Sequence, residues 1–347
     1  MGVSKFMVQR WMGRVVETGS LALDRVLAAL DEQADRFSRR RFKDAPLAAV
    51  LVGPALVLVG VFGIAPMAYA LYLSLFRLRG QEEVFVGLAN YREAMGSAPF
   101  WDSVLVTVYY VLGTVPASLV LSFLAATVLF RLTRLRNVFR TVYFLPFVTS
   151  VVAAATVWRV LLEPTSGVAS QWMELAGLPA QTWLLEPRGI LYLLSDGRIP
   201  PKIGPSLALC CVMLFEVWRS SGFMIVVFLA GLSAMPRELE EAARLDGAGW
   251  YRTVRHVTLP MLSPTLFFLT TISVIGAFQA FSGIYALTGN GRGPLDTTQN
   301  LTVYLYTNFY EFGRLGYGSA IAVILCLALV VLTLVQWRVV RNRVHYS

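Results

Sequence analysis

The sequence predicts an all-α, polytopic membrane protein that crosses the bilayer six times, and three observations support this fold class. Of its 347 residues, 56% are hydrophobic and 15% are charged, which is more apolar than an ordinary soluble protein. The charged residues fall in clusters between long apolar runs. Six of these runs reach the length of about 20 residues that a helix needs to cross the hydrocarbon core.

Residues 1–46 form a polar N-terminal extension, and residues 47–347 hold the six expected spans. Within the extension, apolar side chains recur at helical spacing at Leu23, Val26, Leu27 and Leu30. This pattern is typical of an amphipathic helix, which would lie either in the lipid interface or in solution. A signal peptide would place its apolar run near the start of the chain, so we expect the first span to remain as an anchor.

The expected spans cover residues of about 47–76, 103–130, 138–162, 205–232, 262–287 and 317–337. The first is long enough to tilt or to extend beyond the lipid. Membrane helices tolerate proline because neighbouring helices can pair with the freed carbonyl groups. The prolines in or near the first three spans are Pro54, Pro66, Pro116 and Pro146.

The distribution of Lys and Arg predicts the orientation. With the N-terminus inside, 20 of these residues fall in inner segments and 8 in outer segments, and Arg159 and Arg219 lie within spans. Because inner loops of membrane proteins carry the excess of positive charge, both termini and the loop at 233–260 are expected in the cytoplasm. The net charge of +9 then fits basic loops beside anionic lipid, and we expect no nucleic-acid partner.

The polar loop at 233–260 has the signals of a helix–turn–helix. Pro236 and Glu238 suit the first turn of a helix, because proline needs no hydrogen bond there and an acidic side chain complements the helix dipole. Gly247 is a helix stop, since glycine tolerates the left-handed conformation at a cap. A second short helix is expected from about Trp250 to His256, ending before Pro260.

The same loop carries a spaced motif. It reads Glu241-Ala242-Ala243, three residues, Gly247, nine residues, Val257, one residue, Leu259-Pro260. This resembles the "EAA" signature of membrane subunits of binding-protein-dependent ABC importers, with Val257 in place of isoleucine. The resemblance implies a type I importer permease whose loop is a coupling helix seated in a cleft of a cytoplasmic ATPase. The coupling residues would be Glu241, Ala242, Ala243, Asp246, Gly247, Leu259 and Pro260; the alternative is an ordinary amphipathic loop.

Further segments from about residue 47 onward resemble the carbohydrate-uptake members of that family. They are Gly87-Leu88 with Asn90-Tyr91, Trp218-Arg219, Ala286-Leu287-Thr288-Gly289 and Gly316-Tyr317-Gly318-Ser319-Ala320. The resemblance is closest to the maltose and glycerol-3-phosphate type. It implies a second, similar permease, an ABC ATPase dimer and an outer substrate-binding protein as partners. The extension at 1–46 and a stretch at about 188–204 depart from the family pattern, and the second predicts no particular fold.

No site for covalent or metal chemistry is recognisable in the sequence. Lys5, Lys43 and Lys202 are the only lysines and none follows a glycine, so the chain lacks the Gly-Lys pair of a P-loop. We therefore expect no enzyme activity and no cofactor in this chain, with ATP and Mg²⁺ bound by a separate ATPase. The three cysteines lie inside apolar spans and the two histidines are far apart, so neither a disulfide framework nor a zinc site is expected.

Polar residues at membrane depth are the candidates for a transport route. Glu216 and Arg219 are three residues apart on one face of the fourth span. A charge at the centre of a bilayer costs about 2.5–3.5 kcal/mol on insertion scales, so this face should meet protein or water. The pair either lines a substrate route or only holds helices together. By the resemblance, substrate contacts would come from Glu216, Trp218, Arg219, Ser220, Phe223, Gln279, Ser282 and Tyr285; ordinary packing is the alternative for each.

These observations favour the permease subunit of an ATP-driven importer in the bacterial inner membrane. The substrate implied by the resemblance is a sugar, an oligosaccharide or glycerol phosphate. An ion-coupled secondary transporter using Glu216 is the alternative, but such carriers often contain inverted repeats, and no repeat is apparent here. A membrane anchor without transport would leave Glu216 and Arg219 unexplained.

Overall fold

The computed structural model describes residues 45–79, 82–132, 136–179, 181–195, 197–201 and 203–341. The predicted amphipathic helix at 23–30 lies outside these residues. The described chain divides into two compact units with a boundary after Tyr69. Each unit is helical, as the sequence predicts.

The first unit is an apolar helical rod. It contains α2 (Ala45–Val59), the π-helical turn η1 (Gly60–Ile64) and the first half of α3 (Ala65–Ser74). Pro54 lies inside α2 without ending it. The stretch Val50–Ser74 is long and apolar enough to cross a membrane, so the first span falls where the sequence predicts it.

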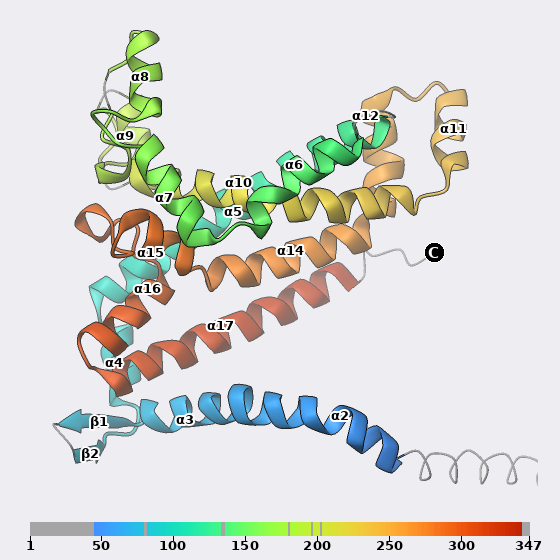
Figure 1. Cartoon of the computed structure of the whole chain (residues 1–347). Coiled ribbons are helices and arrows are strands. Elements are labelled where there is room, and N and C mark those ends of the chain that lie inside the picture. Colours follow the sequence, from blue (N-terminus) through green and yellow to red (C-terminus); the bar gives the residue numbers. More distant parts are fainter. Residues whose placement is uncertain are drawn as a thin grey trace, which may run out of the picture. The chain divides into compact units, whose positions relative to one another are not determined.

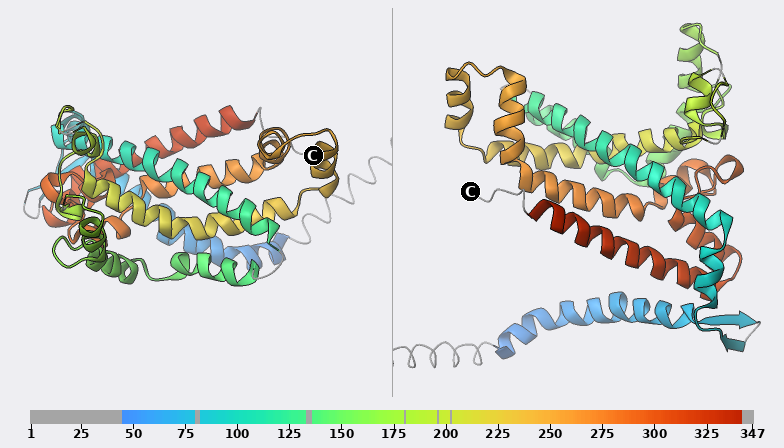
Figure 2. Two further views of the ribbon diagram at one scale, coloured as in Figure 1. Left: turned by 90° about the horizontal axis from the view of Figure 1, so that it is seen from above. Right: turned by 180° about the vertical axis from the view of Figure 1, so that it is seen from behind.

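The second unit is built on four long helices that run alongside one another (Figures 1 and 2). They are α5 (Ala98–Arg131), α10 (Leu207–Ser233), α14 (Ser263–Phe278) and α17 (Leu315–Arg341). Two clusters of buried side chains join α10 to α5 and α14. One surrounds Tyr110 and Phe215, and the other surrounds Phe228 and Leu269. The middle of α10 is therefore held between two neighbouring helices.

Two of the expected spans are bent. The third consists of α6 (Arg136–Val148) and α7 (Val151–Leu161), which meet at an angle of 96°. The fifth is preceded by a segment bent by 72°, and its helix ends at Phe278. The expected span 262–287 therefore covers α14 and the separate helix α15 (Ser282–Thr288) rather than one helix. Among the described residues, four helices are long and apolar enough to cross a membrane, or six if each bent pair is one span.

Figure 1 places two sets of short elements at opposite ends of α10. Before its first turn lie α8 (Val168–Leu175), η2 (Trp183–Leu185) and α9 (Ile190–Leu194). After its last turn comes α11 (Arg237–Leu245). We call these the α9 end and the α11 end of α10.

The stretch at about 188–204, whose fold the sequence does not predict, begins beside a buried carboxylate. Glu186 is 5% exposed and accepts hydrogen bonds from the Arg188 guanidinium at 2.7 Å and the Thr182 hydroxyl at 3.1 Å. The Arg188 guanidinium lowers the pKa of this carboxyl to about 2. A backbone bridge from Gly189 to Ser206 then closes the loop against the start of α10.

A hairpin follows the first span, and it is the one strand pair of the described residues. β1 (Phe76–Arg79) and β2 (Glu82–Phe85) are antiparallel, and α4 (Ala89–Met95) comes next. The Asn90 amide donates to the carbonyls of Ser74 at 2.8 Å and Phe76 at 2.9 Å. This asparagine thereby fixes the turn between the span and the hairpin.

After α15, the chain forms short helices before it enters α17. These are η4 (Pro294–Asp296), α16 (Leu301–Tyr306) and the π-helical turn η5 (Thr307–Glu311). The Asn300 side chain accepts a hydrogen bond from the Val303 amide at 2.9 Å and so caps α16. Its amide also donates to the Ala280 carbonyl at 2.6 Å, which ties α16 to the chain just before α15.

Candidate functional site

The 233–260 loop begins with the helix that its sequence predicts. Helix α11 follows Pro236 and carries Glu238 and Glu240 in its first turn. It ends at Leu245, and Gly247 adopts a φ of +75°. The Ala248 amide then donates to the Ala243 carbonyl at 2.9 Å. This is the hydrogen bond of a left-handed glycine cap, so Gly247 reverses the chain as expected.

The second part of the loop is longer than predicted. It comprises α12 (Trp250–Thr253), the π-helical turn η3 (Val254–Thr258) and α13 (Leu259–Met261). The expected end before Pro260 is wrong, because the helical path continues through that proline. Pro260 lies at the start of α13, directly after a π-turn, where a missing N–H costs little. The 72° bend comes after α13 instead.

The side chains of the motif lie at the surface of this loop. Glu241 and Ala242 are exposed and Ala243 is partly exposed. Apolar side chains nearby are also exposed, with Leu245 at 89% and Tyr251 at 64%. Large exposed apolar groups on a polar loop are typical of a surface that binds another protein.

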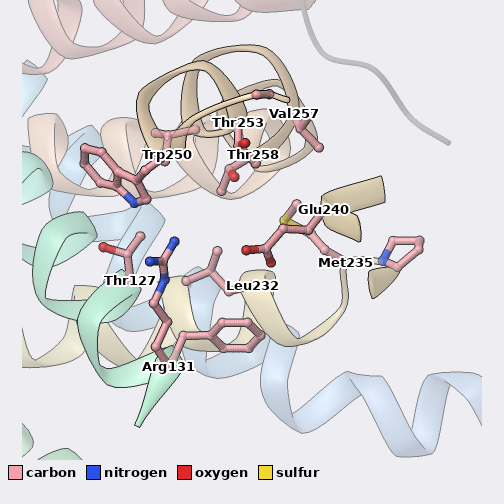
Figure 3. Close-up of a pocket in the computed structure, with 13 residues that line it drawn as sticks. Thr127, Arg131, Leu232, Met235, Glu240, Trp250, Thr253, Val257 and Thr258 are labelled. Carbon is pink, nitrogen blue, oxygen red and sulfur yellow. The ribbon is translucent and has the colours of Figure 1, made fainter. Parts of the chain in front are cut away.

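A cavity of about 590 Å³ lies between this loop and the ends of α5 and α10 (Figure 3). In Figure 3, the Arg131 guanidinium and the Glu240 carboxylate point toward the same space from opposite walls. Trp250 and Thr127 also border it. The sequence did not single out Arg131 or Glu240 as site residues, because they belong to elements more than 100 residues apart.

Glu216 and Arg219 form an ion pair on α10. The Arg219 Nε donates to Glu216 Oε2 at 2.9 Å, and Nη2 donates to Oε1 at 2.7 Å. Their side chains are 21% and 22% exposed. The two side chains therefore pair with each other, as one of the two interpretations requires. Because both are partly exposed, the pair also borders open space.

That space is a cavity of about 260 Å³ bounded by α5, α6, α10 and α14, which we call the ion-pair cavity. Hydroxyl groups from three helices reach it. Ser118 and Ser220 are hydrogen-bonded to each other at 3.1 Å. The hydroxyl of Ser273 is buried and has no hydrogen-bond partner among the described residues. The cavity thus offers hydroxyls beside the charges. Its lining residues are Thr114, Val115, Ser118, Phe147, Glu216, Arg219, Ser220, Phe223, Met224, Ile272, Ser273, Gly276 and Ala277.

The structure brings together half of the predicted route residues. Glu216, Arg219, Ser220 and Phe223 all line the ion-pair cavity. Ser118 and Ser273 could not be identified as site residues from the sequence. Hydroxyl side chains occur throughout the spans, and only the packing brings these two beside α10.

The other four predicted residues lie elsewhere. Trp218 packs against Trp158, with ring centroids 5.6 Å apart. Gln279 borders a separate cavity of about 450 Å³ beside α17. Ser282 begins α15 and is exposed, and the ring of Tyr285 stacks on Phe281 at 5.2 Å.

Comparison with known proteins identifies the class of chain to which these features belong. The family model for a binding-protein-dependent transport system inner membrane component matches residues 86–345. The permease protein UgpA of the sn-glycerol-3-phosphate transport system of Agrobacterium fabrum is 31% identical over 88% of this chain and 98% of its own. The trehalose/maltose transport system permease protein MalF of Thermococcus litoralis is 29% identical, over 88% and 97%.

A solved structure shares the fold. A chain of a bacterial alginate ABC transporter, crystallised with an alginate pentasaccharide-bound periplasmic protein, superposes with a TM-score of 0.71. It is 20% identical, and the match covers 86% of this chain and 95% of that one. The expected type I importer permease fold is therefore confirmed. Sequence and fold agree that this chain belongs to the binding-protein-dependent transport system inner membrane components, the permease subunits of ABC importers.

Proposed function

We propose that this chain forms part of the path by which an ABC importer moves a sugar, an oligosaccharide or glycerol phosphate across the bacterial inner membrane. The relatives named above support this substrate range, since their names include trehalose, maltose and sn-glycerol-3-phosphate. An ion-coupled carrier using Glu216 has no support from them.

The proposed coupling to an ATPase is supported by the exposed surface of the 233–260 loop. Its Gly247 turn places α11 outside the bundle, with exposed apolar side chains and the exposed Glu241. We assign this surface to the cleft of a cytoplasmic ATPase, where Glu241 would meet a basic residue and the small Ala242 and Ala243 would allow close approach. Asp246, Gly247, Leu259 and Pro260 would hold the loop in shape.

The complete transporter would contain a second, similar permease, two ATPase subunits and an outer substrate-binding protein, all in or against the lipid bilayer. ATP and Mg²⁺ would bind to the ATPase subunits, and this chain would catalyse no reaction of its own. ATP-driven closure of the ATPase pair would move the two coupling loops and open the spans outward. ATP hydrolysis would then reset them, which is alternating access.

The direct test is reconstitution. The chain, co-expressed with its partner subunits and inserted into vesicles, should import a radiolabelled sugar or glycerol phosphate only when ATP and the binding protein are both present. Uptake that needs an ion gradient and no ATP would overturn the proposal. Affinity purification of this chain should also recover the ATPase.

The orientation of the chain in the membrane can be tested with a matched pair of leucines that are nearly fully exposed. Leu175 on α8 is 87% exposed and Leu245 on α11 is 89% exposed, and they flank opposite ends of α10 (Figure 1). With native cysteines replaced, Leu175→Cys should react with an impermeant thiol reagent from outside the cell. Leu245→Cys should react only after permeabilisation, because the α11 end faces the cytoplasm. Labelling of both from one side would contradict this topology.

A further inference from the structure

The ion-pair cavity holds one positive and one negative side chain, and their charges cancel. Arg219 donates to both carboxylate oxygens of Glu216, at 2.9 Å and 2.7 Å. Among the described residues that line the cavity, these two are the only ones with an ionised side chain. The cavity therefore presents polar groups without a net charge.

These polar groups retain hydrogen-bonding capacity. A guanidinium has five N–H donors, and Glu216 takes two of those of Arg219. Glu216 and Arg219 are partly exposed to the cavity. Ser220 is also partly exposed, and its contact with Ser118 at 3.1 Å uses only one donor of the two hydroxyls. A ligand with several hydroxyl groups could satisfy these donors and acceptors together.

An anionic ligand meets different conditions. A free arginine fork pairs well with carboxylate or phosphate, but here Glu216 occupies the Nε–Nη2 side of the guanidinium and neutralises its charge. An incoming anion would therefore either face the Glu216 carboxylate or displace it, and displacement would leave a partly buried carboxylate without its partner. Both outcomes are unfavourable where the charged groups are partly buried.

We propose that the ion-pair cavity selects uncharged polyhydroxyl ligands and that Glu216 is the residue that excludes anionic ones. This inference rests on the proposed function, because it assumes that the cavity lies on the transport route. Family membership alone does not decide the charge of the substrate. The names of the relatives include neutral sugars and an anionic sugar alcohol phosphate, and the ion pair favours the neutral class for this chain.

The experiment uses two probes of nearly equal size, maltitol and maltobionate, which differ by a terminal CH₂OH in place of a carboxylate. Their dissociation constants are measured by saturation-transfer NMR on the complete transporter in nanodiscs, without the binding protein, so that only the membrane cavity selects. Wild type should bind maltitol more tightly than maltobionate. Its affinity for maltobionate should also change little with ionic strength, because the cavity has no net charge.

Variants then change the cavity charge in steps. Glu216→Gln leaves Arg219 unneutralised and should shift the affinity ratio toward maltobionate by about tenfold or more. Arg219→Gln should shift the ratio the other way. The double variant restores neutrality and should return to the wild-type ratio. Glu174→Gln makes the same change of charge on the exposed surface of α8 and should leave the ratio unaltered.

Tighter binding of maltobionate by wild type, or the same ratio in all four cavity forms, would overturn the inference. Either result would leave ATP-driven uptake, and hence the proposed function, intact. Binding of neither probe while ATP-driven uptake persists would show that the cavity does not select polyhydroxyl ligands of this size, and would overturn this inference alone. If the single variants do not assemble, the wild-type preference and its salt dependence still test whether the cavity favours the neutral ligand.

Discussion

The 233–260 loop and the ion-pair cavity are two polar regions of an apolar chain, and they differ in how their polar groups are paired. In the cavity, Arg219 and Glu216 satisfy each other on one helix. In the loop, Glu241 is exposed and Leu245 lies 89% exposed beside it. The charges of the cavity are therefore paired within this chain, whereas the loop exposes side chains that, under the proposed function, would contact a second protein.

Among the substitutions that distinguish the loop from the cavity, Ala243→Arg is expected to have the largest effect. This alanine is partly exposed on α11, and a long charged side chain would hold the ATPase surface away from the helix. We expect recovery of the ATPase in affinity purification to fall by about tenfold or more, at normal expression.

Ala176→Arg provides the control for that change. Ala176 lies at the end of α8, at the α9 end of α10, so the same side chain should leave ATPase recovery unchanged. Full ATPase recovery with Ala243→Arg would show that the loop is not the docking surface.

A second effect should appear in the cavity region and spare the loop. A Cβ on Gly222 would lie 2.1 Å from the Tyr143 carbonyl oxygen, whereas one on Gly276 would meet nothing within 4 Å. Gly222→Ala should therefore destabilise the bundle by about 1–3 kcal/mol, and Gly276→Ala should not destabilise it. Thermal unfolding in detergent measures both. Equal melting temperatures would mean that α6 and α10 are not packed as described.

A smaller effect is expected from backbone strain within the loop. Gly247 has a φ of +75° and open space around it, so Gly247→Val should cost about 1 kcal/mol or more through conformation alone. Uptake per ATP hydrolysed should fall several-fold as α11 loses its alignment. Gly249 also has open space but a φ of −69°, so Gly249→Val should couple normally. Equal coupling in the two variants would contradict the role of the turn.

The smallest effect should lie outside both regions, at Glu186. Its folded-state pKa of about 2 lies below the usual value of 4.5 because Arg188 pairs with the carboxylate. The pair therefore stabilises the loop fully above pH 4.5, and this contribution is lost as the pH falls toward 2. Glu186→Gln should cost about 1 kcal/mol at pH 7, measured by thermal unfolding. Its difference from wild type should shrink below pH 4.5; a difference that is constant down to pH 3 would contradict this assignment.

Local patterns allowed much of the loop and of the charge pair to be predicted from sequence. Pro236 and Gly247 mark the start and the end of α11, because of the backbone properties of proline and glycine. Glu216 and Arg219 are three residues apart on a helix, so their pairing needs no knowledge of the tertiary fold. The long apolar runs likewise predicted the principal helices.

Features that depend on packing could not be predicted in this way. The 96° bend between α6 and α7 falls at Thr149 and Ser150. Single hydroxyl residues also occur inside unbent membrane helices, so these two did not predict a bend. The resemblance predicts both Trp218 and Arg219 as route residues, yet adjacent residues on a helix point in different directions, and Trp218 packs on Trp158 instead. Ser118 and Ser273 line the cavity from other helices, and no spacing in the sequence predicts that they lie close together.

The close approach at Gly222 determines how movement can travel through the bundle. Helix α10 runs unbroken over 27 residues, and at Gly222 its backbone lies against the backbone of α6, with no side chain between them to yield. Arg219 is about 20 Å from the α11 end at the rise of an α-helix. Because α10 is continuous over this distance, we expect a displacement of its α11 end to move the ion pair and α6 together as a rigid body.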